Sequence, residues 1–467
     1  MRPGLEASLG GWLRPLRPGP GALLLTLVFV ALALLRTHEI DTTFRLLGEQ
    51  IRDWRIALGS VRDLPLLGTP STAGGTTLGP IYYWYLWLVR VSIGPFADNL
   101  PHAGGIGIAL LQSAADVALT LALRRRFDSW PLALAVVLFA ATSPYDLVLS
   151  SIIWNPAVAT AFAKLAIAAV LLRPPEASPW RSAAAVALAW LAVQAHTAAI
   201  FVAAPIIGWV VIASTVERRD VRASLGRLRL AIEVILVLQL PFLVHHLTAP
   251  HLRAVDVPPW GGLERALYDP YTLRLGESSA AFVAAVEFLL VSPARFPHVG
   301  WLLVAAAVIV AARFRRDGAV LAATLGPLAS VVAGFSLWRG AGFQHYWYVS
   351  VMPAVALTVA LSLTGLATAR VGRVLPTLLL VAVVAGIPGR ARAAWATVPM
   401  PAYGPLVRGS RMVLQRLPEV RAITMPGLHE TTDPAFVYEV LGGHISASAP
   451  FAARIGPGGE VSFEVAR

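Results

Sequence analysis

The chain has 467 residues, of which 57% are hydrophobic and 14% are charged, and its formal net charge is +12 at pH 7. The apolar residues form continuous runs of about 20 residues, the length that crosses a bilayer as a helix. This pattern excludes a soluble domain and argues against a membrane β-barrel, whose strands alternate in polarity. The chain has no cysteine, which excludes disulfides, cysteine metal ligands and thiol nucleophiles.

Arginine supplies almost all of the positive charge and gathers in short segments between the apolar runs. In a soluble protein this charge would suggest a nucleic-acid partner. Between spanning helices it is explained by the preference of arginine and lysine for the cytoplasmic side of a membrane. We therefore expect an all-α, polytopic protein of the cell membrane, with the lipid bilayer and not nucleic acid as its partner.

The first apolar run covers residues 22–35 and is preceded by Arg14 and Arg17. The charge rule predicts a cytoplasmic N-terminus, with Glu39 and Asp41 on the outer side. The Ala-x-Ala motif at 31–33 lies within the run and not after it. We therefore expect an uncleaved first span and not a signal peptide.

A long outer loop is predicted over residues 37–102. Its first part has apolar residues at spacings of three and four, which is typical of an amphipathic helix on the membrane surface: Phe44, Leu47, Ile51, Trp54 and Leu58. A glycine-rich turn from 68 to 80 follows, and then an aromatic segment at 81–94 that suits the headgroup region. If that segment spanned the membrane, the three arginines at 124–126 would end on the outer side, against the charge rule.

Ten further spans are predicted after this loop, which gives about eleven in all. The second to fourth spans cover about residues 103–123, 130–148 and 157–172. The fifth runs from about 182 to 194, the sixth ends near 217, the seventh covers about 230–244 and the eighth ends near 313. The last three cover about 319–337, 346–367 and 376–389. Residues 245–297 form a second outer loop. Residues 1–393 would thus form the transmembrane domain, and 394–467 a small extracytoplasmic α/β region with a helix at 405–417 and strands at 421–425 and 461–465.

Two carboxylates, Glu39 and Asp41, follow the first span. A carboxylate at this edge of the membrane could act as a general base and remove a proton from an acceptor hydroxyl. Alternatively, Asp41 caps the amphipathic helix and Glu39 is simply solvated, which composition alone favours. The balanced charges of the loop fit a solvated helix face.

Other polar groups fall on the same predicted side. The glycine-rich turn could fit tightly around a phosphate or sugar, although a plain connection between helices needs glycine too. Three helix ends carry the motifs Trp154-Asn155-Pro156, Gln194-Ala195-His196 and Gln344-His345-Tyr346-Trp347-Tyr348. They could share one polar site, while a lone histidine at a helix end is more often only interfacial.

The second outer loop holds arginines that could pair with a phosphate through two hydrogen bonds each, namely Arg253, Arg265 and Arg274. Its histidines, His245, His246 and His251, lack a fixed helical spacing, so a metal site there is disfavoured.

Within the spans, Asp116 and Lys164 are expected to form a buried pair, because an unpaired charge in lipid is costly. An ion pathway through these two residues is the alternative.

The order of these features along the chain resembles that of the GT-C superfamily of membrane glycosyltransferases. Its members use polyprenyl-phosphate sugars and include arabinose transferases and protein mannosyltransferases. The resemblance covers most of residues 22–367. It rests on the acids outside the first helix, the Gly-Pro-Ile-Tyr-Tyr-Trp segment at 79–84, the Leu-Arg-Arg-Arg-Phe helix end at 123–127, Thr142-Ser143-Pro144, and the three helix-end motifs with the following Met352-Pro353.

The resemblance implies an inverting transfer of a sugar from a lipid phosphate to an acceptor at the outer face, with an acid of the first loop as the base. The superfamily often has an Asp-Glu pair there, whereas this chain has Glu39-Ile40-Asp41. We predict Asp41 as the base, with Glu39 second. Residues expected to bind donor or acceptor are His38, Gly79, Pro80, Tyr82, Tyr83, Asn155, His196, Arg265, Arg274, Gln344, His345 and Tyr346.

No cofactor is firmly implied, and a divalent metal is possible because metal use varies within the superfamily. A transporter or lipid flippase is the alternative from another class. Transporters place polar groups near the bilayer midplane, often with inverted repeats, whereas here the polar groups gather at one face. A surface-polysaccharide polymerase or ligase would share the topology and differ in the donor.

Overall fold

The structure is a computed structural model that describes residues 19–70, 76–172, 179–248, 274–292, 296–338, 343–366, 371–396, 403–426 and 433–465. Within these ranges, seven segments are long and apolar enough to cross a membrane. They are built on α2 (Pro20–Arg36), α6 (His102–Phe127), α9 (Asn155–Leu172), α11 (Ile200–Arg218), α12 (Val221–Thr248), α18 (Met352–Leu366) and α19 (Val371–Ala396). The chain is therefore a polytopic helical membrane protein, while the expected number of eleven spans stays a prediction.

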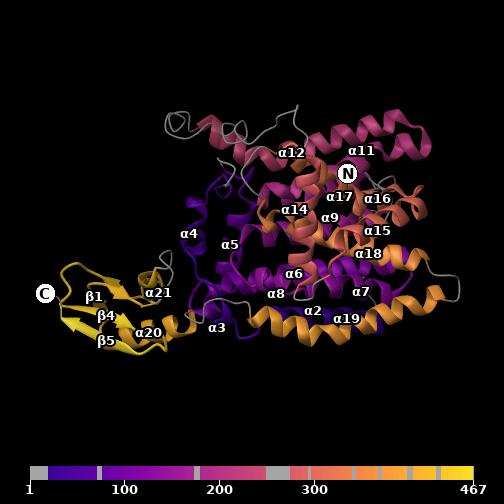
Figure 1. The fold of residues 1–467 in the computed structure, drawn as a ribbon. Helices are drawn as coiled ribbons and strands as arrows, with labels where there is room; N and C mark the ends of the chain where they lie inside the picture. Colours follow the sequence, from indigo (N-terminus) through magenta and orange to yellow (C-terminus); the bar gives the residue numbers. More distant parts are fainter. Residues whose placement is uncertain are drawn as a thin grey trace.

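Other helices complete the bundle (Figure 1). Three are shorter and apolar, α7 (Trp130–Ala141), α15 (Val299–Arg313) and α17 (Leu325–Ser336). The remainder are α8 (Pro144–Leu149), α10 (Pro179–Ala195), α14 (Leu275–Val286), α16 (Gly318–Ala323) and the short turns η4 (Thr197–Ala199), η6 (Glu287–Val291) and η7 (His345–Val351).

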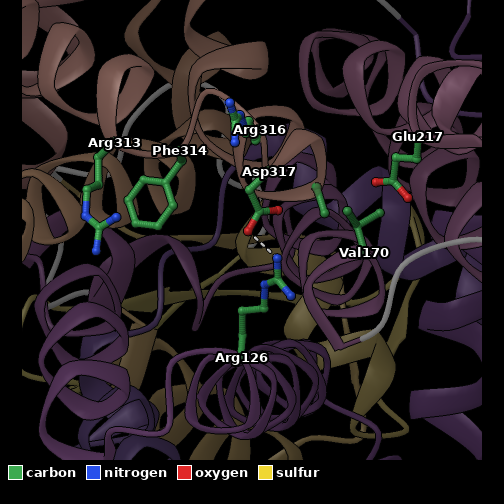
Figure 2. Close-up of a pocket in the computed structure, with 8 residues that line it drawn as sticks. Arg126, Val170, Glu217, Arg313, Phe314, Arg316 and Asp317 are labelled. Carbon is green, nitrogen blue, oxygen red and sulfur yellow. Dashed lines mark hydrogen bonds and ion pairs between the residues drawn. The ribbon is translucent and has the colours of Figure 1, made fainter.

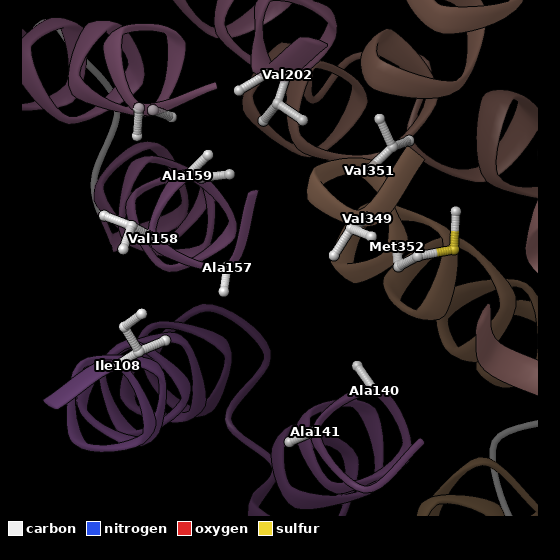
Figure 3. Close-up of a cluster of buried hydrophobic side chains, with 14 of the residues drawn as sticks. Ile108, Ala140, Ala141, Ala157, Val158, Ala159, Val202, Val349, Val351 and Met352 are labelled. Carbon is white, nitrogen blue, oxygen red and sulfur yellow. The ribbon is translucent and has the colours of Figure 1, made fainter. Parts of the chain in front are cut away.

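Alanine contributes many of the buried side chains where the central helices meet, and small residues let helices approach closely in a membrane. Figure 3 shows part of this core, where Ile108 of α6, Ala157 of α9 and Val202 of α11 lie around Val349 and Met352. All five side chains are buried, and they belong to one continuous hydrophobic core.

The segment predicted as the first outer loop forms α3 (Ile40–Thr43), α4 (Gly48–Leu58), the turn η1 (Val61–Asp63), α5 (Ile81–Ser92) and the turn η2 (Gly94–Ala97). The predicted amphipathic spacing is confirmed in α4, which buries Ile51 and Trp54 against the bundle. The idea that Asp41 caps this helix is wrong. Asp41 lies inside α3, and α4 begins later because the Gln50 side chain accepts a hydrogen bond from the Leu47 amide at 2.8 Å.

Three boundaries differ from the predicted ones. The single span expected at 130–148 is broken into α7 and α8, because Ser143 caps a new helix by accepting from the Asp146 amide at 3.1 Å and Pro144 opens it. The segment between residues 217 and 230, which lies between two predicted spans, is helical from Val221 in α12. The predicted loop at 245–297 contains α14 and η6.

The C-terminal region stands to one side of the bundle (Figure 1). Its described residues form α20 (Tyr403–Arg416), α21 (Pro434–Val440) and five strands, β1 (Glu419–Val420), β2 (Ile423–Thr424), β3 (His444–Ile445), β4 (Phe451–Ile455) and β5 (Val461–Val465). β1 pairs with β3 in parallel, while β4 pairs in parallel with β2 and antiparallel with β5. The expected helix and the two expected strand segments all occur, and α20 packs against α3 beside Asp41.

Candidate active site

The Asp41 carboxylate lies where α3, α6 and α20 meet. Its side chain is 81% exposed, and its Oδ1 is 3.3 Å from Nε2 of His102, the first residue of α6. On the other side of the ring, Nδ1 of His102 is 2.6 Å from the hydroxyl of Tyr403 in α20. Burial raises the pKa of the Tyr403 phenol, so this hydroxyl keeps its proton and can donate it to Nδ1.

Glu39 is held less closely. Its side chain is 68% exposed and its carboxylate is 3.8 Å from Nε2 of His38, whose ring packs against Trp395 at 4.0 Å. The backbone of Glu39 has a positive φ of 47°, a conformation that residues other than glycine adopt at some cost in free energy. Of the two predicted carboxylates, Asp41 therefore has the better-defined surroundings.

The helix-end motifs meet at a second cluster. The Asn155 side chain donates to the Ala195 carbonyl at 2.9 Å and to the Thr69 hydroxyl at 3.0 Å. These bonds join the start of α9, the end of α10 and the glycine-rich turn. Gly79 packs so tightly on Gln194 that a Cβ at this position would clash with it. The glycine there allows a close approach of backbone to side chain.

Aromatic rings from the third motif complete this cluster. Tyr346 lies 5.9 Å from His196 and 5.1 Å from Trp154 between ring centroids. The three motifs, far apart in sequence, thus lie together. Gln344 directly precedes η7, and His345 begins it.

A row of side chains leads from the loop of Asp41 to this cluster. Arg45 lies close enough to Tyr145 for the two to interact electrostatically. The ring of Tyr145 is 3.9 Å from Phe288, and Phe288 stacks on His345 at 4.5 Å. Arg45 and Phe288 extend the candidate site beyond the residues predicted from the sequence.

A buried charge network lies beneath this row. The predicted pair is confirmed, with Lys164 Nζ 2.8 Å from Asp116. Arg36 is 2.7 Å from Asp116 and 2.6 Å from Asp146, and Lys164 is 3.4 Å from Asp146. Two cations and two anions thus balance between α2, α6, α8 and α9. Arg36 and Asp146 were missed from the sequence, although Ser143-Pro144 marks the helix start that positions Asp146.

Tyr82 and Tyr83, predicted to bind ligand, are buried and donate instead to Asp53 of α4, at 3.1 and 3.2 Å. Burial raises the pKa of the Asp53 carboxyl, against a smaller lowering by neighbouring Arg52. These bonds hold α5 to α4. Pro80, also predicted, precedes the first residue of α5.

The predicted phosphate ligands are only partly described. Arg265, Arg253 and His251 lie outside the described residues. Arg274 precedes α14, where its amide donates to the Ser336 carbonyl at 2.9 Å and its half-exposed side chain is 3.7 Å from Glu277. Among the described residues, no group of three or more His, Asp or Glu side chains is close enough to hold a metal ion.

The sequence matches no protein-family model, and no curated protein is significantly similar to it in sequence. Solved structures do resemble it. ArnT from Cupriavidus metallidurans bound to undecaprenyl phosphate aligns with a TM-score of 0.58 at 17% identity, covering 92% of this chain and 87% of that one. The apo form of the same protein gives 0.56 at 16%, covering 90% and 85%.

The chain has the GT-C fold. An oligosaccharyltransferase from Archaeoglobus fulgidus also matches, with a TM-score of 0.47 at 14% identity, covering 91% of this chain and 62% of that one. At such low sequence identities, these comparisons establish a shared fold and not a shared activity. Within the GT-C fold of this chain, the first spanning helix leads directly to Asp41.

Proposed function

We propose that the protein is a membrane glycosyltransferase that moves a sugar from a polyprenyl phosphate to an acceptor at the outer face of the cell membrane. The observation that carries this proposal is the exposed Asp41 carboxylate at the end of the first spanning helix, backed by His102 and Tyr403. The shared fold with ArnT, whose structure holds undecaprenyl phosphate, supports a lipid-phosphate donor.

In the proposed reaction, Asp41 takes the proton of an acceptor hydroxyl as the hydroxyl oxygen bonds to the anomeric carbon of the sugar. The bond from that carbon to the phosphate oxygen breaks, and its electron pair leaves with the polyprenyl phosphate. Attack from the side opposite the phosphate inverts the configuration. Glu39, whose contact with His38 is longer, stays the second candidate for the base.

His102 suits the role of orienting Asp41. With Tyr403 donating to Nδ1, the ring proton sits on Nε2 and faces the Asp41 carboxylate. The present separation of 3.3 Å is long for a hydrogen bond, and such contacts often tighten when substrate binds. The other oxygen of Asp41 is then left for the acceptor.

The donor phosphate needs cationic partners, for which we propose Arg45 and Arg274, with Arg265 retained from the sequence. Arg45 is half-buried near Tyr145, and this desolvation strengthens its attraction for an anion. His345, Tyr346, His196 and Asn155 would contact the sugar or the acceptor. The described residues do not assemble three metal ligands, so we derive no step through a metal ion.

The orientation of the protein in the membrane follows from the same proposal. The arginine-rich helix ends lie in the cytoplasm, and the C-terminal region lies outside, on the side of Asp41. The contact between α20 and α3 supports a common side for the two. The midspan charges carry no transport path in this account, because they are balanced and paired with one another.

The direct test is donor turnover by the purified protein in lipid nanodiscs. Polyprenyl phosphates carrying labelled hexoses or pentoses are supplied with a membrane extract as the acceptor source, and released polyprenyl phosphate and labelled product are measured. We expect release with at least one of these donors and none with nucleotide sugars. Turnover of nucleotide sugars alone, or movement of the lipid sugar across the membrane without bond cleavage, would contradict the proposal.

A further inference from the structure

A pocket of about 370 Å³ lies at the end of the bundle opposite Asp41. Helix α6 begins at His102 beside Asp41 and runs for 26 residues, so Arg126 near its other end is about 36 Å away along the helix axis. The pocket is open to one side and is lined by Arg126, by Glu217 near the end of α11, and by the turn between α15 and α16 (Figure 2). It is therefore separate from the candidate active site.

The pocket has an excess of positive charge. Arg126 pairs with Asp317, whose carboxylate also caps α16 by accepting from the Val320 amide at 3.2 Å. Glu217, on the far wall, already has a partner of its own. Arg313 and Arg316 line the same space, and no described acid forms an ion pair with either. Two guanidinium groups thus remain to attract an anion.

Apolar side chains also line the pocket, and the helix that ends at it has an exposed apolar face. Phe314 and Val170 line the pocket, and the Arg313 guanidinium lies 5.9 Å from the Phe314 ring centroid. Helix α15, which ends at Arg313, exposes Val304 (54%) and Val308 (63%) along the turns that lead to the pocket. Apolar surface that an acyl chain could cover therefore lies along the helix that ends at the pocket.

We propose that this pocket binds the phosphate of an anionic phospholipid, with Arg313 and Arg316 as its ligands. Guanidinium groups bind phosphate oxygens through paired hydrogen bonds, and arginine pockets between spanning helices are suited to lipid head groups. The acyl chains lie along the exposed face of α15. The bound lipid joins the α15–α16 turn to α6 and α11, and this site does not depend on the proposed transferase activity.

The test is lipid binding measured by native mass spectrometry on the purified protein, titrated with phosphatidylglycerol or phosphatidylcholine. The Arg313→Gln/Arg316→Gln variant removes both proposed ligands. Arg125→Gln/Arg315→Gln is the matched control, because it removes the same charge at the same end from residues that do not line the pocket. We expect the first variant to weaken phosphatidylglycerol binding about tenfold, with little change in the control.

Three results would overturn the proposal. They are equal weakening in both variants, unchanged binding in the first variant, and displacement of the lipid by soluble glycerol phosphate at the concentration of the lipid itself. Phosphatidylcholine binding should be the same in all variants, which also verifies that they are folded. If the double variant does not fold, Arg316→Gln is compared with Arg315→Gln by the same criteria.

Discussion

His102 Nδ1 and the Tyr403 hydroxyl lie 2.6 Å apart, which joins the first residue of α6 to the C-terminal region at the edge of the candidate active site. Further contacts hold that region against the first outer loop. Arg411 pairs with Asp98 at 2.6 Å, and Arg55 pairs with Asp433 at 3.0 Å. The C-terminal region is thus positioned to shape the surroundings of Asp41.

Replacing Tyr403 with phenylalanine should lower kcat about tenfold with little change in KM for the donor. The variant keeps the ring and loses only the proton donor, so His102 is no longer held with its Nε2 proton toward Asp41. Steady-state turnover of the polyprenyl-phosphate donor measures both constants. A rise in KM at unchanged kcat would instead indicate a role in binding.

Two substitutions of His102 separate orientation from packing. Glutamine can offer an N–H where Nε2 stood, whereas asparagine reaches only to the position of Nδ1. We expect His102→Gln to keep part of the activity and His102→Asn to lose about ten times more. Equal loss in both variants, with equal thermal stability, would count against an orienting role.

The buried charges of Arg36, Lys164, Asp116 and Asp146 should affect the stability of the protein jointly, because they balance one another. Lys164→Met leaves Asp116 and Asp146 with one cation between them, which should cost about 3–5 kcal/mol of unfolding free energy. Adding Asp116→Asn restores one cation and one anion, Arg36 and Asp146, and should recover most of that loss. Unfolding in detergent, followed for both single variants and the double variant, measures the coupling. Purely additive losses would contradict the pairing.

Gly79→Ala should destabilise the glycine-rich turn. The added methyl group would clash with Gln194, which is buried and donates to the Leu238 carbonyl at 2.6 Å. We expect a cost of about 1–3 kcal/mol that shrinks when Gln194→Ala is combined with it. Gly208→Ala is the control, since no atom lies within 4 Å of a Cβ there. Equal effects of the two alanine substitutions would refute the close approach.

Some features of the fold could be predicted from the spacing and type of residues in the sequence. The spacing of Ile51 and Trp54 gave the buried face of α4, because helical periodicity is set within a few turns. The Asp116–Lys164 pair followed from composition, because each buried charge needs a partner of opposite sign. The break after α7 could have been read from Ser143-Pro144, which is a strong helix-start signal.

Other contacts between distant segments could not be predicted in this way. His102 and Tyr403 are 301 positions apart in the sequence, and no motif beside either residue indicates that the two are in contact. The resemblance implies a ligand-binding role for Tyr82 and Tyr83, and the aromatic content of their segment predicts an interfacial position. Their hydrogen bonds to Asp53 depend on how α5 packs on α4, which periodicity does not specify.

The most direct measurement is the rate of polyprenyl phosphate release by Asp41→Asn, beside Glu39→Gln and the unaltered protein. Asparagine keeps the shape of the side chain but cannot accept the acceptor's proton, so the rate should fall about 10²–10⁴-fold while donor binding is retained. Glu39→Gln should keep most of its activity. Full activity of Asp41→Asn would contradict the account.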